Sequence, residues 1–282
     1  MYHLCYKQSI VPTVQVDYVP CEISINVDET MKANGVLHRC LKTFNQIKYV
    51  EDAYEDFIAF KSTVSGPGIT TDMMLERKAR SFFLEFEIFL DQWKKYMLWR
   101  GKKEEFKKFF DQETHNAFDS SDDYALASML RNYLAHNSDV IQGKFWGGNN
   151  VYDVGCSKEG LLSDDSFSKK KKEIIKRQPA QLISLSPIMK GALEKLKEIH
   201  KAFMDFDFGN EEVEAARIVS AAVSLIHKAG LEDKQLAIVN DIKSPITTHT
   251  PEGTPIETVW ATEYHDFKWR DFSELLTYLL PE

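Results

Sequence analysis

The sequence predicts a mainly α-helical protein with small β elements near its N-terminus and C-terminus. Two patterns lead to this fold class. Apolar residues recur at steps of three and four over most of residues 33–240, which is the period of an amphipathic helix. Apolar and polar residues instead alternate over 14–28 and again over 256–264, as they do in half-buried strands. The hydrophobic content of 43% over 282 residues is sufficient for a buried core.

Residues 1–32 are expected to form a short β-rich N-terminal extension. Two alternating stretches, separated by Pro20, predict a two-stranded unit. The alternating apolar positions are Val14, Val16, Tyr18, Ile23, Ile25 and Val27. At the other end, residues 241–282 are expected to form a strand and a short helix around 272–280 that pack on the main domain. We expect that strand to pair with the N-terminal strands.

The main helical domain is expected over 33–240. Its first helical segment begins near Ala33 and ends at residues 65–68, because glycine and proline interrupt a helix. A longer helix opens at Thr71 and Asp72, which suit an N-cap, and continues to Trp99. Its broad apolar face must be buried against other helices, so we interpret its aromatic residues as core. The face consists of Leu75, Ala79, Phe82, Phe83, Phe86, Phe89, Leu90, Trp93 and Met97.

Shorter elements follow this helix. One helix is expected over 103–110, and another begins at Ser120 or Ser121, where Ser120 and Asp123 have the spacing of a capping box. A glycine-rich and polar stretch from residue 143 to 168 is expected to be an irregular loop. The later helical segments are residues 184–206, 210–229 and 231–239.

Charge and cysteine usage narrow the possible functions. The net charge of -8 argues against broad electrostatic capture of nucleic acid, whereas a nuclease needs only a local cationic site. The apolar runs are far shorter than the ~20 residues that span a bilayer, and the N-terminus does not resemble a secretory signal, so we expect a cytoplasmic protein with no membrane association. The cysteines lack a spacing suited to zinc, and we expect no metal and no cofactor. They are Cys5, Cys21, Cys40 and Cys156.

One short motif carries the functional prediction. The segment YALASMLRNYLAHNSD places Arg131, Asn132 and His136 at the C-terminal end of a predicted helix. None of the other arginines has a histidine after four to six intervening residues, although eight histidines make a chance pairing common. Without further context, Arg131 and His136 are read as a surface ion-pairing residue and an imidazole that caps backbone carbonyls.

In its helical context the motif resembles the HEPN superfamily, whose members share an Arg, four to six residues and a His, often with a polar residue after the Arg. The motif here reads RNYLAH, and the segments LERKARSFFLEFEIFLDQW, FKKFFDQETHNAF and LRNYLAHN follow the family order over residues 73–137. The resemblance implies a helical bundle, a homodimer with its site at the interface, and an endoribonuclease that cleaves RNA without metal. It also implies a microbial toxin–antitoxin or abortive-infection defence system, with restraint by an antitoxin or a regulatory protein.

The residue types suit this chemistry. An imidazole can accept or donate a proton near neutral pH, a guanidinium can hold a phosphate, and the Asn132 amide can orient His136 or a phosphate oxygen. On an ideal helix Asn132 and His136 share a face, whereas Arg131 and His136 diverge by about 140°. Either the helix loosens near His136, or the motifs of two chains meet across a dimer.

One dense basic stretch, Lys169, Lys170, Lys171 and Lys172, has two interpretations. It either holds RNA phosphates or forms a solvated loop or helix start. The sequence has no glycine motif of a phosphate-binding loop and no nucleophile elbow. The alternative function is a catalytically inactive helical module that uses the same face to dimerise or to bind a partner. A chance occurrence of RNYLAH in a different helical bundle is the third reading.

Overall fold

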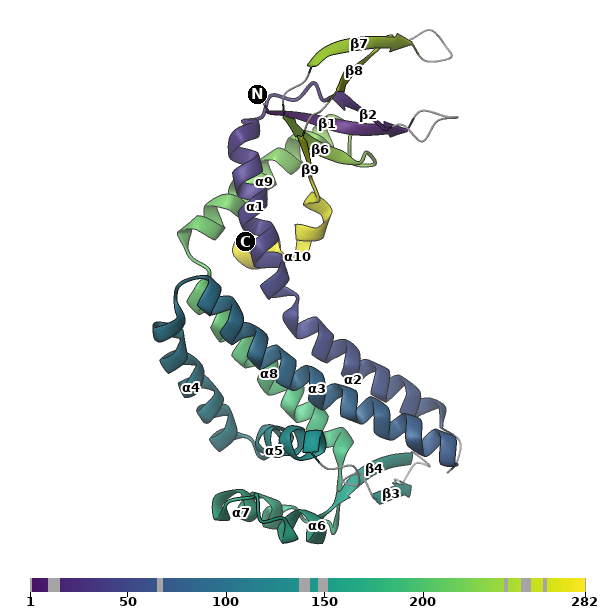
Figure 1. Cartoon of the computed structure of the whole chain (residues 1–282), viewed down its shortest axis with the longest axis vertical. Coiled ribbons are helices and arrows are strands. Elements are labelled where there is room, and N and C mark those ends of the chain that lie inside the picture. Colours follow the sequence, from purple (N-terminus) through teal and green to yellow (C-terminus); the bar gives the residue numbers. More distant parts are fainter. Residues whose placement is uncertain are drawn as a thin grey trace. The chain divides into compact units, whose positions relative to one another are not determined.

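A computed structural model describes residues 2–9, 16–64, 68–136, 143–146, 152–240, 243–249, 255–260 and 263–281 (Figure 1). The chain divides into two compact units, each described by itself. The first combines Met1–Phe44 with Asp207–Glu282, and the second is Asn45–Phe206. The domain boundaries expected at 32/33 and 240/241 both fall inside the first unit. The fold is mainly α-helical, as the sequence predicts, with strands near both ends of the chain.

A six-stranded antiparallel sheet forms one part of the first unit (Figure 1). Its spatial order is β7-β8-β2-β1-β6-β9. The strands are β1 (Tyr2–Ser9), β2 (Val16–Pro20), β6 (Leu236–Asn240), β7 (Lys243–His249), β8 (Pro255–Trp260) and β9 (Glu263–Asp266). The expected pairing between the two ends of the chain is confirmed, because Tyr18 of β2 lies opposite Val259 of β8. The β1 strand also pairs with β6, so the N-terminal strand lies inside the sheet.

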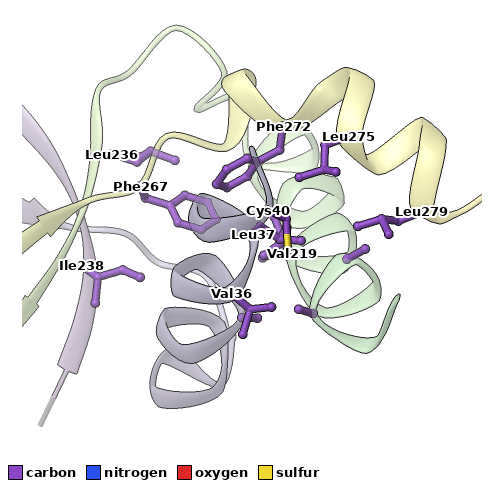
Figure 2. Close-up of a cluster of buried hydrophobic side chains, with 14 of the residues drawn as sticks. Val36, Leu37, Cys40, Val219, Leu236, Ile238, Phe267, Phe272, Leu275 and Leu279 are labelled. Carbon is purple, nitrogen blue, oxygen red and sulfur yellow. The ribbon is translucent and has the colours of Figure 1, made fainter. Parts of the chain in front are cut away.

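Helices cover one face of this sheet and enclose the core of the first unit. They are α1 (Val27–Phe44), α9 (Asn210–Lys228), the 3-10 turn η1 (Trp269–Phe272) and α10 (Ser273–Leu279). Figure 2 shows Leu37 of α1, Val219 of α9 and Phe272 pointing toward one another beside Ile238 of β6. His38 meets the Phe272 ring edge-on at 4.9 Å between centroids. This core therefore joins residues from both ends of the sequence.

Two expectations for this unit are corrected. Residues 21–26 form no strand, although Ile23 and Ile25 alternate with polar residues. Each donates its backbone N–H to the carbonyl two residues before it, at 2.8 and 3.2 Å, and the apolar side chains rest against the core as the chain leads directly into α1. The helix expected over 231–239 is also wrong, because Leu236–Asn240 is the strand β6. A short apolar run suits either element, and the pairing with β1 decides it.

The second unit contains most of the helices. They are α2 (Gln46–Thr63), α3 (Ile69–Trp99), α4 (Lys103–Ser120), α5 (Asp122–His136), α6 (Lys158–Ser163), α7 (Lys169–Arg177) and α8 (Leu185–Asp207). A three-stranded antiparallel sheet has the order β3 (Gly143–Trp146), β4 (Tyr152–Ser157) and β5 (Leu182–Ser184). The expected irregular loop over 143–168 is therefore wrong. Residues 147–151 of this stretch lie outside the described part of the chain, but the rest contains β3, β4 and α6, and the ladder of the small sheet requires β5 from beyond it.

The long helix α3 organises the second unit. The apolar face predicted from its sequence is confirmed as core, with Phe82, Phe86 and Trp93 fully buried. This face packs against α2, α4 and α5. The Trp93 indole N–H donates to Nδ1 of the buried His200 on α8 at 3.3 Å, which satisfies a polar group inside an otherwise apolar core. In the parts of the chain that the structure describes, no helix combines the length and the apolarity needed to cross a membrane.

A largely buried polar network links four elements of this unit. The Lys61 ammonium of α2 lies 3.1 Å from the Asp153 carboxylate of β4 and donates to the Ser186 hydroxyl of α8 at 2.7 Å. The Ser184 hydroxyl of β5 donates to the same carboxylate at 2.6 Å. Because both charges are paired and hydrogen-bonded, the network can be buried and still fix the small sheet against the helices.

Gly155 on β4 tests how closely the small sheet packs. A Cβ at this position would lie 2.6 Å from the backbone carbonyl oxygen of Ile183 on β5, which cannot move without disturbing the ladder. We expect Gly155→Ala to lower the free energy of unfolding by about 1–3 kcal/mol, measured by urea denaturation. Gly160→Ala is the matched control, because its Cβ would make only ordinary contacts. Equal stability of the two variants would contradict the close approach of β4 and β5.

Candidate functional site

Helix α5 positions the motif arginine. It begins where Ser121 accepts a hydrogen bond from the backbone N–H of Tyr124 at 3.2 Å, so Ser121 provides the cap, and Ser120 still belongs to α4. The first half of α5 is almost completely buried against α3 and α4. At its N-terminus, Gly191 of α8 leaves the space that the Asp123 side chain occupies. These contacts hold α5 firmly and bring Arg131 to the edge of the core.

The Arg131 guanidinium lies over an aromatic ring of α3. Its central carbon is 5.8 Å from the centroid of the Phe86 ring, within the range of a cation–π contact. Phe86 in turn packs on Tyr124 at 5.4 Å between centroids. The Arg131 side chain is half-buried, and its buried Nε atom has no hydrogen-bond partner among the residues that the structure describes. A buried donor of this kind favours an acceptor from a ligand or a neighbouring molecule.

Arg131 also lines a cavity of about 370 Å³ along the outward side of α3. The lining residues are Arg77, Arg80, Ser81, Phe83, Leu84, Glu87 and Arg131. Three guanidinium groups and a single carboxylate give this wall a positive balance. Guanidinium groups bind phosphate and carboxylate oxygens through paired, charge-assisted hydrogen bonds, so the cavity suits an anion.

Arg77 and Arg80 were not among the residues predicted for the site. They belong to the segment LERKARSFF, whose apolar positions predict a core helix, and their spacing of three places them on one side of that helix. A basic pair on a helix that otherwise buries aromatic residues could have indicated, from the sequence alone, that these two arginines belong to a site. Only the packing of α5 beside α3 brings this pair next to Arg131.

The other two motif residues end the same helix. Asn132 and His136 belong to α5, and their side chains lie outside the part of the chain that the structure describes. The backbone stays α-helical to His136, so the helix does not loosen before that residue. Positions 131 and 136 are therefore separated by about 140° around the helix axis. Of the two arrangements left open by the sequence, a loosened helix loses its support.

The basic stretch begins α7. The helix starts at Lys169 because Ser168 caps it, accepting a hydrogen bond from the Lys171 backbone N–H at 3.5 Å. Lys170 pairs with Asp119 of α4 at 2.6 Å, and Arg177 pairs with Asp122 of α5 at 2.6 Å. The reading of this stretch as a helix start is confirmed. Binding of RNA by Lys169, Lys170, Lys171 and Lys172 stays a prediction.

Neither metals nor known proteins add to this picture. Among the residues described, no three His, Cys, Asp or Glu side chains are grouped so that they could hold a metal ion. No family model, curated protein or solved structure matches this chain.

Tyr124 provides a test of the packing around Arg131. Burial raises the pKa of the Tyr124 phenol from 10.0 to about 12, against an opposing effect of the Arg131 charge. The folded protein thus holds this proton more tightly than the unfolded chain. The resulting stability is complete below pH 10 and is lost as the pH rises from 10 through 12. From pH 9 to pH 11 the free energy of unfolding should fall in the parent protein. We expect it to fall by about 1 kcal/mol less in Tyr124→Phe.

Urea denaturation at the two pH values measures this difference. Tyr49→Phe is the matched control, because it removes the same hydroxyl from an exposed side chain. The same loss of stability in the parent protein and in Tyr124→Phe would contradict the burial of Tyr124 beneath Phe86.

Proposed function

We propose that this protein is a metal-independent endoribonuclease whose site contains Arg131, Asn132 and His136. The observation that best supports the proposal is the position of the half-buried Arg131. This residue belongs to α5, the helix that ends at His136, and it lines a cavity together with Arg77 and Arg80 of α3. A phosphodiester presents the anionic oxygens that such a wall can hold. The resemblance of the motif and its helices to the HEPN superfamily points to the same chemistry.

In the proposed reaction the ribose 2′-oxygen attacks the adjacent phosphorus. A bond forms between them as the bond from phosphorus to the 5′-oxygen breaks, which leaves a cyclic phosphate and a 5′-hydroxyl. The His136 imidazole takes the proton of the 2′-hydroxyl or gives one to the leaving 5′-oxygen, and water carries out the other of these two proton transfers. Arg131 offsets the negative charge that grows on the phosphate oxygens, and Asn132 orients the imidazole or a phosphate oxygen.

We further propose that the site is completed by a second copy of the chain. Positions 131 and 136 diverge on a regular helix, so a single α5 does not direct both toward one phosphate. The outward side of α3 next to the cavity carries large exposed apolar side chains, Leu84 at 56% exposure and Met73 at 65%. Exposed apolar residues next to a charged cavity favour a partner that covers them. A symmetric dimer would bring Arg131 of one protomer toward His136 of the other.

The biological setting is also a proposal. The resemblance favours a toxin or abortive-infection factor of a microbial defence system, acting in the cytoplasm on cellular RNA. A nuclease of this kind requires restraint, and an antitoxin or a regulatory protein would provide it. The exposed residues of α3 favour one alternative function, a catalytically inactive module that dimerises or binds a partner through the same surface.

Cleavage of RNA in the presence of EDTA distinguishes the two functions. We expect the purified protein to cut total RNA under these conditions and to leave 5′-hydroxyl ends. His136→Ala should lower the rate by a factor of about 100 or more, because general acid–base catalysis contributes that much. His115→Ala is the matched control, since His115 is exposed on α4 and its ring contacts the carbonyl of Asp111 one turn earlier. Intact RNA at high protein concentration would favour the inactive module, and a requirement for metal would contradict the mechanism.

Mixing two inactive variants tests the shared site. Arg131→Ala and His136→Ala chains should each be inactive alone, whereas their heterodimer should recover part of the activity, because one of its two composite sites retains both residues. Recovery should increase when the chains are unfolded and refolded together, which exchanges the protomers. No recovery in verified heterodimers would contradict a site built from two chains.

A further inference from the structure

Another cavity lies in the first unit, at one end of three neighbouring strands. Lys7 of β1, Leu236 of β6 and Asp266 of β9 are brought together by the antiparallel register, in which Tyr6 lies opposite Leu236 and Ala237 lies opposite Asp266. The ladder continues past the strand ends, since the Lys7 backbone N–H donates to the carbonyl of Gln235 at 2.7 Å. Paired strands of the sheet therefore form one wall of this cavity.

The cavity has a volume of about 370 Å³, and its lining contains more basic than acidic residues. The residues around it are Lys7, Lys234, Gln235, Leu236, Asp266, Phe267, Lys268, Trp269, Arg270 and Asp271. Four cations face two carboxylates, and Lys7 is already paired with Asp266. In a protein with a net charge of -8, this is a local concentration of positive charge. Such a concentration attracts anions even when the whole molecule is acidic.

Two of these cations lie against aromatic rings. The Arg270 guanidinium lies 5.2 Å from the centroid of the Trp269 ring, and the Lys234 ammonium lies 5.3 Å from that of Tyr6. The Trp269 ring also contacts His227 of α9, at 5.2 Å between centroids and an angle of 82°. A half-buried indole on the cavity wall, next to exposed cations of which two lie against aromatic rings, offers both an apolar surface and positive charge.

We propose that this cavity binds a nucleotide, with the phosphate at Lys268 and Arg270 and the base near Trp269. Arginine and lysine provide the donors that phosphate oxygens accept, and aromatic side chains pack against bases of any sequence. The volume is at the lower end of the range of small-ligand sites, which suits one nucleotide. The same chemistry is presented by a free nucleoside monophosphate and by one residue of a single-stranded RNA. The site lies in a different unit from Arg131, so it does not depend on the proposed cleavage.

Isothermal titration calorimetry with adenosine monophosphate, inorganic phosphate and a short single-stranded oligoribonucleotide tests this site. The full-length Arg131→Ala protein is used, so that the RNA probe is not cut. We expect the double variant Lys268→Glu/Arg270→Glu to bind the nucleotide at least about 100-fold more weakly, because two charge-assisted contacts are lost. The matched control is Lys32→Glu/Arg217→Glu, which makes the same change in charge at exposed positions of the same unit outside the cavity. Its affinity should change less than about threefold.

The outcomes separate the two sources of the ligand. An oligoribonucleotide that binds more than about tenfold more tightly than the mononucleotide identifies an RNA strand as the occupant, and comparable affinities identify the free nucleotide. Trp269→Phe should weaken binding of both while thermal unfolding confirms an intact fold. Inorganic phosphate that binds as tightly as the nucleotide would overturn the role of the base. Binding that is absent at millimolar concentration, or that survives the double charge reversal, would overturn the site.

Discussion

The burial of one face of α3 is the constraint on which the second unit depends. This 31-residue helix carries nine buried apolar side chains, and α2, α4 and α5 each pack against it. Every large ring on that face requires a neighbouring helix, because an exposed aromatic surface would cost roughly 25 cal/mol for each Å² left in water. The helices of this unit are therefore arranged around α3, and the position of α5 follows from the need to cover Phe86 and its neighbours.

The same burial determines the environment of Arg131. Phe86 lies under the guanidinium, and Arg77 and Arg80 of α3 line the same cavity as Arg131. The charge is thus placed where water is partly removed, and electrostatic interactions in such a place are stronger than on an open surface. Phe86 and Arg131 depend on the same packing here, so a change at Phe86 would alter both stability and the environment of the guanidinium.

Local patterns predicted the long helices well and the small sheets poorly. The apolar period of α3 was sufficient because a helix satisfies its backbone hydrogen bonds internally. The strands β1 and β6 gave weak signals, since each is defined by a partner far away in the sequence. The motif residues could be identified from RNYLAH, whereas the contribution of Arg77 and Arg80 required knowing that α5 lies beside α3. The cavity near Trp269 was not predicted, because its walls come from three strands and the segment that follows them.

The discontinuous first unit has a consequence for synthesis of the chain on the ribosome. Its β1 strand lies between β2 and β6, and Tyr6 meets Leu236 only after more than two hundred further residues have been added. The second unit, Asn45–Phe206, is complete before that point and can fold first. Until β6 emerges, β1 has an unpaired edge, which is open to association with other chains. Contacts so distant in sequence also form slowly, so the nascent N-terminal hairpin is the part of this protein for which we expect protection by chaperones to matter most.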